Sequence, residues 1–443
     1  MTAGKEEISQ GFSEITIMKM ARIGRWGMVA AMFTLLCLFG VSRAAADEQG
    51  ELRQKALSLN DITGDDPIDA QIKELVADSA GTKKLLATAV KMSKEKDQPF
   101  NFTAAFILAR AADQLKDLES GQVLYRLCAS EALKLRSTDK MVQAYIGLNE
   151  MLMAHKKFDD AINVCKEVLE LKDDEGRLRL LKVLVLRQMI RGKAKQGKID
   201  EAMKLVDNLV KAIPDNWMTL DLKAWVEHEA GKNEDAAKTW EDVLERIQKD
   251  TNLDKEKEFK TEYLREIRLK LSNVYVDTNQ IDKAAAHLKT LLEQDPDNPG
   301  VNNDLGYIWA DHDMNLDEAE KMIRKALDED RKRRKKENPD LKPEEDKDNA
   351  AYLDSLGWVL FKKKKFQEAK APLLKAIQEE DGKHVEIFDH LAEIHMALGE
   401  KAEAIAVWQK ALKLDTEERR EKELKAKVEK KLKEAMGEKG EKK

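Results

Sequence analysis

The sequence is short of cysteine, of long apolar stretches and of excess positive charge. It has three cysteines among 443 residues, which excludes a small scaffold held together by disulfides. A polytopic membrane protein needs several apolar runs of about 20 residues, and the sequence lacks them. A net charge of −6 and an isoelectric point near 5.9 disfavour a strongly basic nucleic-acid binder. We therefore expect no nucleic-acid partner.

The sequence also lacks the motifs that mark common catalytic and cofactor sites. No Gly-rich phosphate loop, dinucleotide-binding fingerprint, H-E-x-x-H zinc pair, C-x-x-C pair or nucleophile elbow occurs in it. Its seven histidines are scattered. Residues 311–313 (DHD) and 227–229 (EHE) are interpreted as polar surface runs, and His390 and His395 are five residues apart, on different faces of a helix. We predict no enzymatic activity, no cofactor and no metal site.

Apolar and charged residues are both plentiful. Apolar residues make up 42% of the chain, enough to bury a core, which argues against disorder throughout. Charged residues make up 37%, well above the roughly 25% of ordinary globular domains. The chain is nevertheless expected to fold, because its apolar content is sufficient for a core.

The N-terminus has the pattern of an export signal. Basic residues precede the uncharged apolar stretch 28–41, and three alanines at 44–46 form a cleavage signature. We predict that residues 1–46 are a signal peptide, with Met18 or Met20 as alternative starts, and that the protein is periplasmic or secreted. The apolar stretch is shorter than the roughly 20 residues that a spanning helix needs. An uncleaved anchor in the inner membrane is the alternative.

The three cysteines carry separate predictions. Cys37 follows Leu36 inside the apolar stretch, which disfavours lipid attachment because a small residue normally precedes a lipid-modified cysteine. In an exported protein Cys128 and Cys165 could form a disulfide. They could also be small buried apolar residues, which is a common role of free cysteine and the interpretation we favour.

One pattern of side chains recurs eight times along the chain. A small residue opens each copy, a larger side chain stands four residues later, and a third side chain follows three residues after that, so all three lie on one helical face. The small residues are Gly121, Ala161, Ala202, Ala236, Ala284, Ala319, Ala369 and Ala404. The larger ones are Tyr125, Cys165, Val206, Trp240, Leu288, Ile323, Leu373 and Trp408. The small residue would let a neighbouring helix approach, and the larger ones would fill the space between helices.

Another helix is predicted upstream of most copies. It is the first helix of each pair, and the helix that carries the recurring pattern is the second. The first helix carries a signature such as Leu356-Gly357, and turn residues such as Gly231 separate the two helices. Glycine suits the positive φ that ends a helix, and acidic residues then open the next helix, where its dipole favours negative charge. The first copies depart most, with Asn149 and Ile190 at the usually small position.

This arrangement resembles the tetratricopeptide repeat family, whose unit is a helix–turn–helix of 34 residues. The resemblance is strongest at residues 303–327, 352–377 and 388–412, and it is specific because the pattern repeats. It implies an all-α fold, a right-handed α-α superhelical solenoid of about eight repeats across residues 101–415.

Other segments depart from the repeat. Highly charged insertions are expected near residues 249–260 and 331–349, in loops between repeats. Residues 47–100 are predicted to be an N-terminal helical cap or a degenerate repeat. Residues 416–436 are predicted to form a charged C-terminal helix, because a solenoid needs a polar terminal face. We expect residues 437–443 to be a flexible tail.

The resemblance also implies where a partner would bind. In this family the first helices line the concave face, and residues one and four positions beyond the Gly/Ala position face the groove. Those residues are Trp225, His228, Tyr307, Trp358, Phe361, Glu393 and Met396, and polar residues on the same side are Asn303, Asp354 and Asp389. They suit an extended peptide or a partner helix, and they do not reproduce the family's Lys/Asn clamp for a terminal carboxylate. The alternative is that Tyr307 and Trp358 pack against the next repeat.

These features predict a non-catalytic scaffold or adaptor that binds a peptide or protein partner in the cell envelope. One alternative is a small-molecule or glycan-binding module, in which Trp225 and Trp358 stack on sugars. Another is an accessory subunit that regulates a separate enzyme. An uncleaved anchor at residues 28–41 would favour a membrane-bound assembly. Fold analogy alone does not choose among them.

Overall fold

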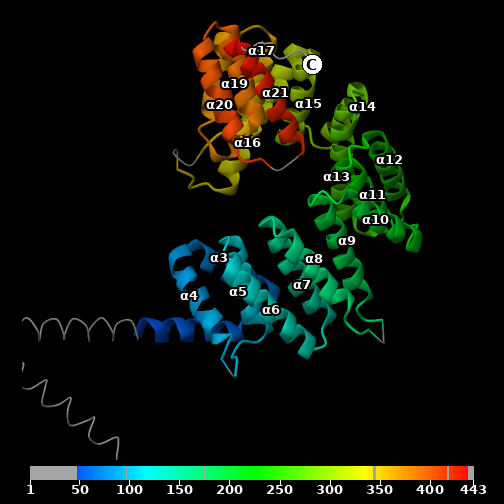
Figure 1. Cartoon of the computed structure of the whole chain (residues 1–443), viewed down its shortest axis with the longest axis vertical. Coiled ribbons are helices and arrows are strands. Elements are labelled where there is room, and N and C mark those ends of the chain that lie inside the picture. The colour runs from blue at the N-terminus through cyan, green and yellow to red at the C-terminus, as the bar shows by residue number, and fades with distance from the viewer. Residues whose placement is uncertain (1–46, 96, 174–175, 343–345, 417–418, 438–443) are drawn as a thin grey trace, which may run out of the picture. The chain divides into compact units, whose positions relative to one another are not determined.

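All regular elements of the described chain are helices (Figure 1). The computed structural model describes residues 47–437 apart from 96, 174–175, 343–345 and 417–418. The predicted all-α fold is therefore confirmed for this part of the chain. The predicted signal peptide and the end of the predicted tail, residues 438–443, lie outside it.

The chain divides into two compact units, and the division falls within α10 (Ile199–Ala212), after Leu205. In the first unit, residues 47–58 are helical and are followed by a single 3₁₀ turn, η1 (Leu59–Asp61). The remaining elements are α3 (Asp65–Ala77), α4 (Ser79–Met92), α5 (Phe102–Gln114), α6 (Leu118–Lys134), α7 (Thr138–Ala154), α8 (Phe158–Leu169) and α9 (Arg179–Lys195). Helix α3 packs against α5, and α4 packs against both α5 and α6.

The second unit continues the succession of helix pairs. Its elements are α11 (Trp217–Glu229), α12 (Asn233–Lys249), α13 (Lys257–Asp277), α14 (Ile281–Gln294), α15 (Pro299–Asp311), α16 (Leu316–Glu337), α17 (Ala350–Lys362), α18 (Phe366–Ala376), α19 (Val385–Ala397), α20 (Lys401–Lys413) and α21 (Arg419–Met436). The pairs from α5–α6 to α19–α20 match the eight copies predicted. Short 3₁₀ turns, η2 (Leu253–Lys255) and η3 (Glu380–Gly382), precede α13 and α19.

The predicted helical face forms the core of both units. Every one of the eight small residues is buried, and so are all the larger side chains four residues later. Trp240 and Trp408 are 3% and 2% exposed, as expected for residues on second helices. The first helices pack side by side, α5 on α7 and α7 on α9 in the first unit, and α15 on α17 and α17 on α19 in the second. The periodicity therefore located the core correctly.

Glycine at the first-helix signature lets two helices approach closely. A Cβ at Gly357 would lie 2.7 Å from the side chain of Leu373 and 3.1 Å from the carbonyl oxygen of Ala369. The same relation holds for Gly306 against the small residue Ala319. The small residues of the two helices thus meet, and a larger side chain at either glycine would separate the pair.

The turns within pairs have one geometry and varied sequence. Gly231 and Gly399 end their first helices with φ of 74° and 79°, as predicted. At the corresponding position other turns place a non-glycine residue in the same left-handed region, and these residues are Lys116, Lys156, Asn279, Asp313 and Lys364. Their hydrogen bonds back to the first helix stabilise the turn despite the side chain's steric cost.

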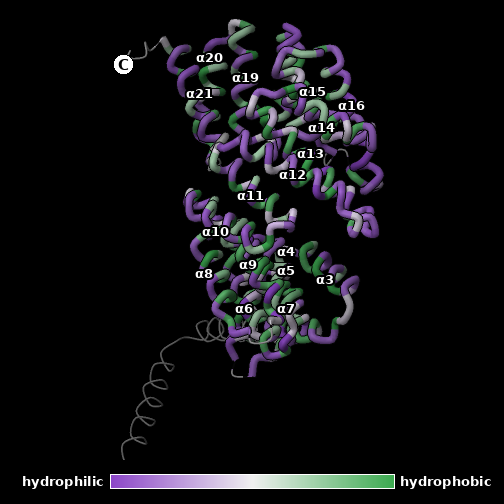
Figure 2. The backbone as a smooth tube through the Cα atoms, turned by 90° about the vertical axis from the view of Figure 1, so that its right-hand side faces the viewer, coloured by the Kyte–Doolittle hydropathy of each residue, from purple (hydrophilic) through white to green (hydrophobic). Residues whose placement is uncertain are grey.

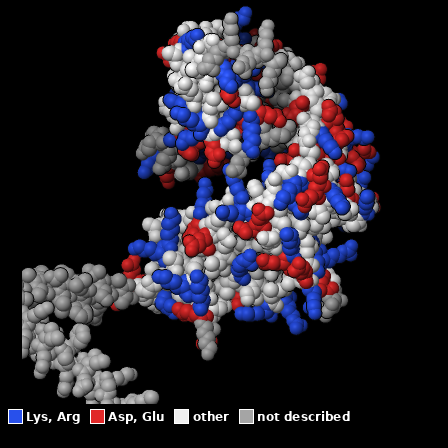
Figure 3. Space-filling model, in the orientation of Figure 1, with Lys and Arg blue, Asp and Glu red and all other residues white. Residues whose placement is uncertain are grey.

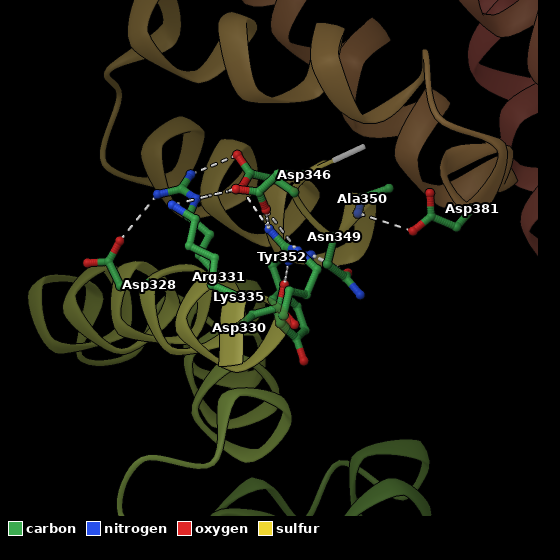
Figure 4. A network of polar contacts seen from close by, with 11 residues as sticks. Asp328, Asp330, Arg331, Lys335, Asp346, Asn349, Ala350, Tyr352 and Asp381 are labelled. Atoms are coloured by element: carbon green, nitrogen blue, oxygen red, sulfur yellow. Dashed lines mark hydrogen bonds and ion pairs between the residues drawn. The ribbon is translucent and has the colours of Figure 1, made fainter. Parts of the chain in front are cut away.

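The larger charged insertion forms ion pairs within itself (Figure 4). Its basic head is helical, because α16 continues to Glu337. Arg331 donates two hydrogen bonds to Asp348, at 2.6 and 2.7 Å, and Arg334 pairs with Asp346 at 2.9 Å. The Arg331 guanidinium accordingly lowers the pKa of the Asp348 carboxyl. The basic head is thus paired with the acidic tail of the same insertion.

The smaller insertion and the C-terminus also form helices. The first contains η2 and then the start of α13 at Lys257. Helix α21 is hydrophilic along most of its length (Figure 2), but Val428, Leu432 and Ala435 form a buried stripe that packs against α19 and α20. Elsewhere basic and acidic side chains are interspersed over the visible surface of each unit (Figure 3).

Cys128 and Cys165 are both buried and free. Burial raises the pKa of both thiols, that of Cys165 to about 12. Asn149, one of the departures from the repeat pattern, is fully buried and donates hydrogen bonds to Cys165 Sγ at 3.1 Å and to the Ala161 carbonyl at 2.8 Å. The two cysteines thus have the buried apolar role that we favoured.

Candidate functional site

A hollow of about 800 Å³ lies on the first-helix face of the first unit. It is bounded by the start of α3 and by α5 and α7, with Tyr125 of α6 in its wall. The packing of α3 against α5 forms one side of it. Lining side chains that the argument uses are Phe102, Phe106, Arg110, Asp113, Tyr125, Lys140, Ile146 and Glu150.

Two phenylalanines on α5 provide the apolar wall of the hollow. Phe102 and Phe106 are four residues apart and stacked, with ring centroids 5.6 Å apart. Lys140 Nζ lies 4.7 Å from the Phe102 centroid, and the guanidinium carbon of Arg110 lies 5.8 Å from that of Phe106. Both cations that line the hollow therefore lie over aromatic rings of the wall. Phe106 is half-buried, so part of its ring remains accessible.

Two carboxyl groups line the same hollow, Asp113 at the end of α5 and Glu150 on α7. Partial burial raises the pKa of Asp113, and burial together with repulsion from Asp113 raises that of Glu150. Arg110 opposes both shifts through its charge, and Arg191 opposes the shift of Glu150. The carboxylates are therefore stabilised incompletely by the protein itself.

The hydroxyl of Tyr125 is buried without a partner in the described part of the chain. A Cβ at Gly147 would lie 2.6 Å from Tyr125 Cε1 and 2.9 Å from its hydroxyl oxygen. Glycine at this position of α7 therefore leaves the space in which the phenol lies. A buried hydroxyl without a hydrogen bond is uncommon in proteins, because it loses its bonds to water.

The aromatic residues predicted to bind a partner lie together in the second unit, joining three first helices. Trp358 stacks on His390 of α19, with centroids 3.9 Å apart, and on Phe361 at 4.9 Å. Its Nε1 donates to Asp311 Oδ1 of α15 at 3.0 Å. The Tyr307 hydroxyl donates to a carboxyl oxygen of Glu386, at 2.6 Å. These side chains are half-buried, and their polar atoms are engaged within the protein.

The predicted acidic residues of this groove are buried and bonded. Asp354 is 6% exposed, and one of its oxygens lies 2.9 Å from His390 Nδ1. Asp389 is 8% exposed, accepts a hydrogen bond from Trp408 Nε1 at 2.8 Å and pairs with Lys431 of α21 at 2.7 Å. Such contacts tie a first helix to its own second helix and to the following helix.

The same link recurs earlier in the unit. Asp221 of α11 accepts hydrogen bonds from Trp240 Nε1 of α12 at 2.9 Å and from Lys270 of α13 at 2.8 Å. In both cases the acid and the tryptophan are 19 residues apart, and the lysine comes from the next helix. The buried acids thus act between helices of successive pairs.

The remaining predicted contact residues are dispersed. Glu393 pairs with Lys431, and Met396 on the same helix is 37% exposed. Asn303 is buried, with its amide nitrogen 3.4 Å from Asp304. Trp225 and His228 lie on α11, where Trp225 is half-buried against the core and His228 pairs with Asp277 at 2.8 Å. The structure therefore brings Tyr307, Asp354, Trp358 and Phe361 together around His390, whereas Trp225 and His228 belong to α11.

Among the described residues, no group of three or more His, Cys, Asp or Glu side chains could hold a metal ion. No helix in the same part of the chain is both long enough and apolar enough to cross a membrane. The apolar stretch 28–41 lies outside that part.

Two segments of the second unit match profiles of the tetratricopeptide repeat family, at residues 269–334 and 385–417. The first reaches from α13 into α16, and the second covers α19 and α20. The chain contains tetratricopeptide repeats. These matches agree with the resemblance expected from the sequence, and the helix pairs α15–α16 and α19–α20 lie largely or wholly within the matched residues.

Known proteins similar to this repeat chain match it at low identity. A curated TPR repeat-containing protein of Pseudomonas aeruginosa is 30% identical over 188 residues, which span 42% of this chain and 26% of the relative. Among solved structures, a tetratricopeptide repeat protein from Parabacteroides merdae is 16% identical, covers 69% of this chain and 98% of its own, and gives a TM-score of 0.43. The human IFIT1 dimer with PPP-AAAA is 13% identical, with coverage of 88% and 85% and a TM-score of 0.46.

The hollow was missed by the sequence analysis, which placed all predicted contacts in later repeats. Phe102 and Phe106 on a first helix, followed by Arg110 and Asp113 on the same face, were a usable signal. No sequence signal indicated that α3 borders the hollow, because α3 lies outside the recognisable repeats and its place depends on how it packs against α5. The unpartnered hydroxyl of Tyr125 is likewise visible only in three dimensions.

The buried His390–Asp354 pair makes the stability of the second unit depend on pH. Burial alone lowers the pKa of the imidazole, but the charge and hydrogen bond of Asp354, with Glu386 and Asp389 nearby, raise it above its ordinary value. A histidine whose pKa is raised on folding stabilises the fold fully below its unfolded pKa, near 6.5, and loses that contribution as pH rises through the folded pKa.

We therefore expect the loss of unfolding free energy caused by His390→Gln to be greatest near pH 6 and to shrink toward about pH 9. Urea denaturation of both proteins at the two pH values measures it. Comparison with wild type cancels contributions of other groups, including His287, whose pKa burial lowers. A loss that does not change with pH would contradict the assignment.

Proposed function

We propose that the chain is a non-catalytic scaffold or adaptor that binds a protein or peptide partner on the face formed by its first helices. Tetratricopeptide repeats generally mediate protein–protein interaction, and the family profiles match two segments of this chain. The proposal goes further by assigning the contact to one face of the array. The alternating polar and apolar lining of that face suits a peptide better than a fully apolar cofactor.

The hollow of the first unit is the observation that carries this proposal. It combines accessible apolar surface on Phe106 and Ile146 with charged groups that the protein leaves incompletely stabilised. The aromatic cluster of the second unit differs, because the polar atoms of Trp358 and Tyr307 already have partners. That cluster remains a predicted second contact, through the accessible part of its rings.

We also propose that the protein works in the cell envelope. The support is the basic, apolar and alanine-rich pattern of residues 1–46, which is typical of a secretory signal. Cell fractionation with N-terminal mass analysis tests it. A native protein that begins at Asp47 and fractionates with the envelope is expected, and an intact N-terminus in a cytoplasmic fraction would contradict the proposal.

Site-specific photocrosslinking tests the binding face. Gln143 is an exposed residue of α7 that lines the hollow, and Ser130 is an exposed residue of the second helix α6. With a photoreactive phenylalanine analogue at one position or the other in the native organism, we expect about tenfold more partner crosslinked from position 143, since crosslinking requires direct contact. Adding the substitution Phe106→Ala to the protein with the photoreactive residue at position 143 should reduce the yield of crosslinked partner. Equal yields from both positions would contradict the proposed face.

A further inference from the structure

The hollow of the first unit carries more negative than positive groups. Its lining includes Asp65, Asp69, Asp113, Asp139 and Glu150, against Arg110 and Lys140. The two cations lie over the rings of Phe106 and Phe102. A bound group of positive charge would therefore be attracted to the hollow, and an anionic one would be repelled.

The lining of the hollow also offers hydrogen-bond acceptors. The carboxylates of Asp113 and Glu150 are acceptors when ionised, and the phenol oxygen of Tyr125 can accept as well. The Tyr125 hydroxyl is the strongest of these indications, because it is fully buried in the wall and has no partner among the described residues. A donor supplied by a ligand would satisfy it.

Arg110 does not already fill this role. Its charge lowers the pKa of both Asp113 and Glu150, yet burial keeps both values above the ordinary ones. No side-chain hydrogen bond contributes to either shift. Asp113 is half-buried and Glu150 is exposed, and a second cation placed between the two carboxylates would reduce their mutual repulsion.

We propose that the hollow binds an extended segment of a partner protein through a Lys or Arg side chain that lies between Asp113 and Glu150 and donates to Tyr125. This inference rests on the proposed function and names the chemistry of the partner. The half-buried apolar side chains Phe106 and Ile146 accept the residues that flank the basic one. A peptide uses both the acidic and the apolar parts of the lining, whereas a free polyamine would use the acidic part alone.

Binding of peptide pools to the purified full-length chain tests this proposal. The probes are labelled heptapeptides, acetylated and amidated at their ends, with mixed flanking residues and a fixed central arginine, citrulline or glutamate. Citrulline has the shape of arginine without its charge. We expect the arginine pool to be retained about tenfold more than the citrulline pool, and the glutamate pool least, because only the arginine carries a positive charge that can pair with the two carboxylates.

Substitutions in the lining of the hollow test whether Asp113, Glu150 and Tyr125 bind the peptides. The double variant Asp113→Asn/Glu150→Gln should lower retention of the arginine pool about tenfold. The matched double variant Glu119→Gln/Asp160→Asn, which removes two exposed carboxylates outside the lining, should leave it unchanged. Tyr125→Phe should keep the fold and weaken binding about threefold to tenfold, because it removes one hydrogen bond to a charged group. Circular dichroism and thermal unfolding check that each variant folds.

Each outcome supports or overturns a defined part of the proposal. Equal retention of the arginine and citrulline pools would contradict the proposed recognition of a basic side chain, but it would still be consistent with peptide binding. Equal retention by the two double variants overturns the assignment to Asp113 and Glu150. Full displacement of the arginine pool by equimolar spermidine would show that the hollow binds cations in general. It would contradict the proposal that its ligand is a segment of a partner protein. Retention of none of the pools contradicts the proposed function as well as the inference.

Discussion

Replacing His390 by leucine is expected to lower the free energy of unfolding of the second unit by about 3–5 kcal/mol, the cost of breaking a buried charged pair. His390 and Asp354 are both 6% exposed, and their bonded atoms are 2.9 Å apart. Leucine fills a similar space but leaves the Asp354 carboxylate buried without its partner. Trp358, which stacks on the imidazole, also loses part of that contact.

Tryptophan fluorescence during urea denaturation measures this effect in the appropriate unit. All tryptophans of the described chain lie in the second unit, and they are Trp217, Trp225, Trp240, Trp309, Trp358 and Trp408. The double variant Asp354→Leu/His390→Leu should regain much of the lost stability, because it removes the buried charge together with its partner. A double variant as unstable as the sum of the single changes would show that the two residues act independently.

Replacing Trp408 by alanine is expected to cost a similar amount, about 3–5 kcal/mol. Trp408 is 2% exposed, and its indole nitrogen is bonded to Asp389, which in turn pairs with Lys431 of α21. Alanine leaves a cavity between α19 and α20, and it removes one of the two bonds that compensate the buried carboxylate. The loss should therefore combine a packing effect with a polar one.

The conservative variant Trp408→Phe separates these two effects. Phenylalanine retains most of the apolar volume but cannot donate to Asp389, so a loss of about 1–3 kcal/mol is expected. Urea denaturation followed by far-UV circular dichroism measures both variants, since the change alters the fluorescence itself. A loss below about 1 kcal/mol for Trp408→Ala would contradict the view that this tryptophan closes the core.

The helix pairs could be predicted because their signal is local and periodic. A small residue such as Ala369, with Leu373 four residues later, marks one face of one helix, and repetition confirms which face is buried. The turns were harder to recognise, because the expected sequence signal was a glycine with positive φ, and Lys364 adopts that left-handed backbone conformation instead. Hydrogen bonding to the preceding helix outweighs the local preference there.

The contact sites could be predicted only in part because they depend on long-range pairing. Tyr307 and Trp358 were correctly placed on the first helices, but their partners Glu386 and His390 belong to repeats further along the chain. No spacing within one repeat indicates such pairs. The charged insertion shows the same limit, since it was expected to be a loop and no spacing indicated that Arg331 pairs with Asp348.

The hollow depends on elements that the repeat pattern does not describe. Helix α3 belongs to a segment expected to be a cap or a degenerate repeat, and its start forms one edge of the hollow. Gly147 is an unremarkable helix residue in the sequence, yet a Cβ there would meet the ring of Tyr125. Packing between helices, rather than composition, created the candidate site.

Hydrogen–deuterium exchange of the full-length chain, with and without the partner isolated by photocrosslinking, tests the central claim most directly. The claim is that the partner contacts the first-helix face of the first unit. We expect slower exchange on binding in α5 and α7, residues Phe102–Gln114 and Thr138–Ala154, because a bound segment reduces their local opening. Slower exchange confined to the second helices α6 and α8, or to α15, α17 and α19 of the second unit, would contradict it.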